Sequence, residues 1–148
     1  MQIFVSNEQN DLEFSESRVI SIVQSVLAEE NIDCDEVNVY LVSEEKITLL
    51  HEKYFNKPEP TDCISFPLNI EEFIGPRHLG EVVVCPKIAI EYAREHKISP
   101  QHEVTLYIVH GILHLVGYDD IDEVDKKEMR KAEKHHMNLL SEKGILDP

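Results

Sequence analysis

Cysteine is scarce in this sequence, and internal repeats and low-complexity tracts are absent. The three cysteines, Cys34, Cys63 and Cys85, are an odd number and far apart, and no C-x-x-C pair occurs. This spacing indicates neither a disulfide framework nor a zinc ribbon, so we interpret each cysteine as a small buried apolar residue.

Long apolar runs are also missing, since no stretch reaches the roughly 18 consecutive apolar residues that a membrane span needs. The first ten residues, MQIFVSNEQN, lack the basic segment followed by an apolar one that marks a secretory signal. We therefore expect a cytoplasmic protein without membrane contact.

Basic residues are few: 14 Lys and Arg stand against 29 Asp and Glu, which gives a net charge of −15. A strongly acidic surface repels a polyanion at long range, so composition alone argues against a nucleic acid partner. The length of 148 residues fits one domain, over residues 1–148, that is large enough to bury a core.

Hydrophobic periodicity and turn residues predict alternating strands and helices. Strands are expected at 2–5, 37–42, 63–66 and 81–84, and helices at 16–30, 44–54, 86–96, 101–116 and 123–141. The stretch 56–61 is interpreted as a turn and 68–79 as an irregular loop. The pattern indicates one α+β domain, in which helices flank a small mixed sheet and a central buried helix carries a metal site.

That central helix, 101–116, is apolar nearly all round from Leu106 to Val116 apart from two histidines. His110 and His114 are four residues apart, so both imidazoles lie on one face and can reach one ion. Gly117 suits a left-handed turn that ends the helix and returns Asp120 toward the same point.

The simpler interpretation is that both histidines only pack inside the helix. Buried neutral imidazoles need a hydrogen-bond partner or a metal, however, and an acidic residue follows at the spacing H-x-x-x-H-x-x-G-x-x-D. We therefore predict one divalent transition-metal ion bound by His110, His114 and Asp120, and no organic cofactor. Zinc is favoured, with nickel, manganese and iron left open, and three protein ligands leave a position for a catalytic water.

A zinc protease of this pattern has Glu after the first histidine as its general base, whereas this chain has Gly111. The pattern therefore predicts a metal-dependent hydrolase that is not a protease of the usual mechanism.

Residues 110–120, HGILHLVGYDD, resemble the signature H-G-x-L-H-L-x-G-Y-D-H of the YbeY family. Two further blocks, Pro60–Pro67 (PTDCISFP) and Gly80–Val83 (GEVV), are similar to that family's P-T-D-V-L-S-F-P and G-D-I segments, in the same order. The resemblance implies an α+β fold, one metal ion and single-strand-specific cleavage of RNA in ribosomal RNA maturation and ribosome quality control. Ribosomal RNA and the small ribosomal subunit are then the expected partners.

The sequence departs from this family at two positions. Asp120 replaces the usual third histidine, which keeps an acceptable zinc ligand but makes the site less electropositive. Phe55 follows Tyr54 where many members carry an Arg suited to gripping a phosphate. Arg77 is a candidate to take over that task.

Asp62 and Glu81 are weak candidates for orienting water or substrate, with a turn cap and an ordinary surface acid as the alternatives. Asp119 either holds a ligand imidazole or forms the turn. We expect His136 to pack and His135 to be solvated.

A basic face is predicted on the last helix, either as an RNA or ribosome contact or as a solvated face paired with Glu128 and Glu133. Its members are Lys126, Lys127, Arg130, Lys131 and Lys134.

These observations favour a metal-dependent endoribonuclease. Two alternatives stay open: a metal-stabilised ribosome-assembly factor without nuclease activity, which the acidic charge and the absent Arg support, and a hydrolase of a peptide or small phosphoester.

Overall fold

The computed structural model describes residues 1–68 and 77–146, which form a four-stranded sheet and five helices. The elements in chain order are β1 (Gln2–Glu8), α1 (Glu16–Glu29), β2 (Glu36–Val42), α2 (Glu44–Phe55), β3 (Cys63–Pro67), β4 (His78–Val84), α3 (Pro86–His96), α4 (Pro100–Leu115) and α5 (Glu123–Glu142).

The sheet is mixed, with strand order β1-β2-β4-β3. β1 pairs in parallel with β2 and β2 in parallel with β4, whereas β3 pairs antiparallel with β4 at the edge. The central strands are rich in β-branched residues, and Val39, Val82 and Val84, which share the main apolar cluster with α1 and α4, have no exposed surface.

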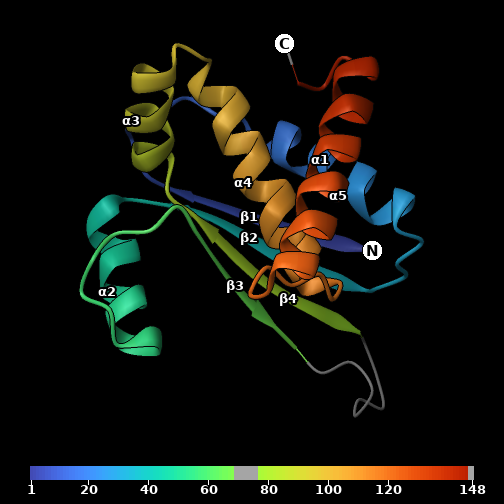
Figure 1. The fold of residues 1–148 in the computed structure, drawn as a ribbon, viewed down its shortest axis with the longest axis horizontal. Helices are drawn as coiled ribbons and strands as arrows, with labels where there is room; N and C mark the ends of the chain where they lie inside the picture. Colours follow the sequence, from blue (N-terminus) through green and yellow to red (C-terminus); the bar gives the residue numbers. More distant parts are fainter. Residues whose placement is uncertain (69–76, 147–148) are drawn as a thin grey trace.

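The helices form two unequal layers around the sheet. α1, α4 and α5 lie over one face, where α4 runs between α3 and α5 (Figure 1). α2 covers part of the other face, where Ile47 packs with Val42, Ile64 and Val83 in a second, smaller apolar cluster. This arrangement encloses α4, and it is why that helix is apolar on most sides.

The ends of α4 follow from local sequence signals. The Ser99 hydroxyl accepts a hydrogen bond from the His102 backbone amide, and Pro100 occupies the first turn. Beyond Leu115, Gly117 adopts a positive φ of 112°, so the chain turns back over the helix end. No helix within the described residues is both long enough and apolar enough to cross a membrane.

The predicted α+β fold is confirmed, and each expected helix is present within a residue of its predicted bounds. The predicted strand ends are less accurate than the predicted helix ends. β1 continues to Glu8 because parallel pairing with β2 persists through polar residues, and β4 starts at His78, so the loop predicted for 68–79 is wrong at 78–79. The middle of that predicted loop, 69–76, lies outside the described residues.

Candidate metal centre

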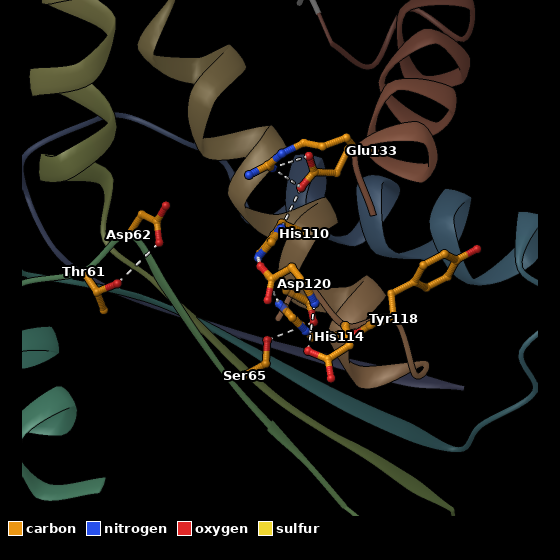
Figure 2. A network of polar contacts seen from close by, with 11 residues as sticks. Thr61, Asp62, Ser65, His110, His114, Tyr118, Asp120 and Glu133 are labelled. Carbon is orange, nitrogen blue, oxygen red and sulfur yellow. Dashed lines mark hydrogen bonds and ion pairs between the residues drawn. The ribbon is translucent and has the colours of Figure 1, made fainter. Parts of the chain in front are cut away.

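His110, His114 and Asp120 converge at the C-terminal end of α4. The two Nε2 atoms lie 3.0 Å apart, and Asp120 Oδ2 lies 3.6 Å from each of them. These separations bracket the ~3.4 Å edge of a tetrahedron whose ligands lie about 2.1 Å from its centre. Figure 2 shows the three side chains gathered at one point, each only partly exposed.

The second ring nitrogen of each histidine is already used. His110 Nδ1 donates to Glu133 Oε2 at 2.6 Å, and His114 Nδ1 donates to the Tyr118 carbonyl at 3.0 Å. In the neutral rings both Nε2 atoms are therefore bare acceptors that face each other and a carboxylate. A cation between these lone pairs would satisfy all three groups at once, so the three residues fit a divalent metal ion.

Glu133, on α5, is the residue that orients His110. Its carboxylate is only 5% exposed and also accepts a hydrogen bond from Arg130 at 2.7 Å. Burial opposes ionisation of Glu133, but the hydrogen bonds from His110 and Arg130 outweigh it and hold the pKa of this carboxyl below its usual value. The charged carboxylate thus keeps a proton on His110 Nδ1 and leaves Nε2 free for a metal.

The loop that carries Asp120 is anchored by Tyr118. Its hydroxyl donates to Glu30 Oε1 at 2.9 Å, and Glu30 Oε2 lies 2.7 Å from Nε2 of the buried His136. The Tyr118 carbonyl meanwhile holds His114. One residue therefore links a metal ligand to α1 and α5, which restricts the loop between Gly117 and α5.

Gly111 occupies the position of the protease base and faces the sheet. A Cβ added there would lie 2.4 Å from Val82 Cγ1 and 2.9 Å from Cys63 Sγ. The Gly111 carbonyl also accepts a hydrogen bond from the Ser65 hydroxyl at 2.9 Å. A glutamate cannot be accommodated here, so the structure excludes the usual zinc-protease base from this position.

His110 and His114 form part of the lining of an open groove of about 480 Å³ between α4, α2 and β3. Cys63 is in this lining, but desolvation first and the charge of Asp62 second raise the pKa of its thiol far above the usual value. The raised pKa keeps the thiol protonated, which makes it a poor nucleophile. The other lining residues include His51, Phe55, Ser65, Gly117 and Asp119.

The weaker candidates Glu81, Asp62 and Asp119 make hydrogen bonds outside the cluster of His110, His114 and Asp120 side chains. Glu81 is on the opposite face of the sheet, where its carboxylate accepts hydrogen bonds from Tyr40 and Asn38; the structure does not bring it to the groove. Asp62 is exposed and its Oδ1 lies 3.5 Å from the Thr61 hydroxyl, in keeping with the turn role (Figure 2). Asp119 Oδ1 accepts from the Asp120 backbone amide at 2.8 Å, which is the turn-forming alternative.

The structure places Phe55 and Arg77 differently. Phe55, at the position where many family members carry an arginine, lines the same groove as His110 and His114. Arg77 is instead tied by its backbone to Asp35 at the start of β2, and it is not in the groove lining. His136 is buried and His135 is exposed, as predicted.

The basic residues of α5 are all exposed, but they are not equivalent. Lys126 lies 3.7 Å from Glu123, whereas Arg130 binds the carboxylate that holds His110. Arg130 is therefore part of the support of the metal centre as well as part of the basic face.

Glu133, His51 and Tyr118 were not identified from the sequence as site residues. A signal existed for Glu133, because it falls in the apolar stripe of α5 between Met129 and His136 at helical spacing. An acid in such a stripe needs a buried partner. No comparable sequence pattern indicated His51 or Tyr118 as site residues.

Comparisons with known proteins identify the family and agree with the fold. The family model described as "Endoribonuclease YbeY" matches residues 4–141. The chain is 51% identical over 138 residues to the endoribonuclease YbeY of Protochlamydia amoebophila, which covers 93% of this chain and 92% of that protein. The Finegoldia magna endoribonuclease YbeY is 38% identical, with coverage of 98% and 95%. The solution structure of TM1509 from Thermotoga maritima aligns with a TM-score of 0.64 at 32% identity, and covers 95% of this chain and 91% of that one.

Proposed function

The chain belongs to the YbeY family of endoribonucleases, and we propose that it cleaves single-stranded ribosomal RNA with one zinc ion held by His110, His114 and Asp120. The observation that supports this proposal most directly is the convergence of two imidazole nitrogens without hydrogens and a carboxylate beside an open groove. Its site of action is the cytoplasm, and its partner is the small ribosomal subunit.

Zinc is supported by the chemistry of the ligands. Two imidazoles and one carboxylate are a usual set for catalytic zinc, whereas calcium and magnesium prefer oxygen ligands alone. When bound, zinc supplies a water whose pKa is about 7 and polarises a phosphoryl oxygen.

The chain's own residues prepare the site for that ion. Glu133 and the Tyr118 carbonyl orient the two imidazoles, and Asp120 adds a negative charge that raises affinity for a cation. Partial exposure of all three ligands leaves the centre open to water and to a substrate phosphate in the groove.

A second candidate function is a ribosome-assembly factor that binds the same metal and cuts nothing. The net charge of −15 and the phenylalanine at position 55 both favour the assembly factor, because each weakens binding of an RNA phosphate. Both candidates require the metal for stability, so only a cleavage assay separates them.

The test is single-turnover cleavage of an end-labelled single-stranded RNA by the protein as purified, after chelation, and after zinc is restored. We expect cleavage in the first and third conditions and none in the second. Elemental analysis should give close to one transition ion per chain, and the double variant His110→Ala with His114→Ala should lose it. Intact RNA with every metal tested, together with retained binding to ribosomal subunits, would replace the nuclease with the assembly factor.

A further inference from the structure

An exposed aromatic side chain stands on the rim of the metal groove. Phe55, the last residue of α2, is 49% exposed and shares the groove lining with His110 and His114. His51, one helical turn earlier, lies in the same lining, and the ring centroids of His51 and Phe55 are 5.8 Å apart. Two rings of α2 therefore face the same groove as the metal ligands.

Further rings support Phe55 from the side of the sheet. Phe66 on β3 lies 6.4 Å from Phe55 and 5.0 Å from Tyr54 between ring centroids. Tyr54 and Phe66 line the pocket on the opposite face of the sheet, so Phe66 contacts Phe55 from outside the groove, and Phe55 and His51 are the two rings of this group that line the groove itself.

The hydrogen bonding of His51 determines what its other nitrogen can do. Nδ1 lies 2.7 Å from the Glu59 carbonyl, which can only accept, so Nδ1 carries the proton. In the neutral ring Nε2 is then a free acceptor. An acceptor beside an apolar ring face matches a nucleobase, whose π-face stacks while its exocyclic amine donates.

We infer that Phe55 and His51 form a nucleobase subsite, in which one unpaired base next to the scissile phosphate stacks on Phe55 and donates to His51 Nε2. This inference rests on the proposed nuclease function. It gives a physical reason for a preference for single strands, because a base must leave its own stack to bind an aromatic side chain. It also suits an acidic chain, since stacking needs no neutralised phosphate.

The test is a double-mutant cycle with the zinc-loaded enzyme, in which a substitution in the protein is combined with the removal of a base from the RNA. Wild type and Phe55→Ala are compared on a short single-stranded RNA and on matched RNAs in which one base at a time is removed to leave an abasic nucleotide. Base–aromatic stacking predicts that kcat/KM falls about 5- to 150-fold for Phe55→Ala. The same loss should appear in wild type at one abasic position, and the two changes together should cost no more than either alone.

Three controls accompany the cycle. Phe55→Tyr keeps the ring and should retain activity. Phe4→Ala removes a ring of similar exposure, 51%, from β1 at the opposite edge of the sheet and should change nothing. The slope of log affinity against log salt should be the same for Phe55→Ala and wild type, because no phosphate contact is lost.

The outcomes distinguish the two hypotheses. If wild type cleaves RNA and Phe55→Ala cleaves it equally well, or if the abasic and Phe55→Ala effects simply add, the subsite is wrong while the nuclease stands. Equal losses in Phe4→Ala and Phe55→Ala would likewise overturn it. If wild type cleaves no RNA with any metal, the proposed function fails and the subsite fails with it.

Discussion

The two ligand histidines differ in what holds their second nitrogen. His114 donates to the backbone carbonyl of Tyr118, a partner that no side-chain substitution removes, whereas His110 depends on the buried carboxylate of Glu133. A carboxylate partner also raises the basicity of the imidazole and so strengthens its bond to a metal. The residue-level predictions therefore concern Glu133 and the third ligand, Asp120.

Replacing Glu133 should weaken metal binding without removing a ligand. We expect Glu133→Ala to lower affinity about 10- to 100-fold, and Glu133→Gln to lower it less because an amide oxygen still accepts from His110. Competition with a chromophoric chelator measures both. Glu142→Ala, an exposed change at the end of the same helix, is the control. Unchanged affinity in Glu133→Ala would refute the orienting role.

Asp120 is tested by restoring and removing a ligand. Asp120→His should retain the ion, since imidazole is an equivalent donor, and Asp120→Ala should bind it more weakly, as judged by metal content after dialysis against a weak chelator. Asp119→Asn removes a neighbouring charge but keeps the acceptor for the Asp120 amide, so it should match wild type. Equal metal content in wild type and Asp120→Ala would show that Asp120 does not bind the metal.

At the scale of the element, two adjacent residues of α4 have different structural roles. His110 must face the metal, and Gly111 must let the helix approach the sheet closely enough for the Ser65 hydroxyl to reach its carbonyl. The ligands are thus carried by a helix whose position on β3 and β4 is determined by the absence of one side chain. That contact places His110 and His114 on the side of the groove that faces β3.

Gly111→Ala should destabilise the protein, although alanine is normally the better helix former by about 1 kcal/mol. The added Cβ would meet Val82 Cγ1 at 2.4 Å, so overpacking should lower the free energy of unfolding by ~1–3 kcal/mol. Urea denaturation measures this change in the free energy of unfolding. In a Val82→Ala background the cost should shrink but not vanish, because the two Val82 methyl groups are gone while Cys63 Sγ stays at 2.9 Å. A more stable Gly111→Ala would show that α4 can move away from the sheet.

For the whole molecule the question is how a chain of charge −15 approaches RNA. The lysines of α5 lie on an exposed face, and Arg130 there is bonded to Glu133. A substitution of Arg130 would therefore disturb the carboxylate that orients His110 as well as the basic face, and a test of the basic face must leave this residue in place.

Neutralising Lys127, Lys131 and Lys134 together should weaken RNA binding. The slope of log affinity against log salt should become shallower by about 0.7 for each lost phosphate contact, with metal content unchanged. Lys97→Asn, at the end of α3, is the control for loss of charge elsewhere. Binding equal to wild type in the triple variant would show that the face is only a solvated surface.

The sequence by itself determined the elements and brought out the three candidate metal ligands, His110, His114 and Asp120. The periodicity of α4, the histidines four residues apart and the glycine that turns the chain back toward Asp120 are all local, so their geometry follows from neighbouring residues. Family motifs in the same segment led to the endoribonuclease assignment, which the comparisons confirm.

Only the tertiary structure decided which other residues reach the site. Glu133 and His51 come from α5 and α2, and nothing local to either helix specifies where it packs. Glu81 and Val82 are adjacent in β4 but point to opposite faces, and which face α4 covers depends on strand order β1-β2-β4-β3. Contacts of this kind join residues far apart in the chain, so they arise from packing of the complete domain and leave little trace in any single segment.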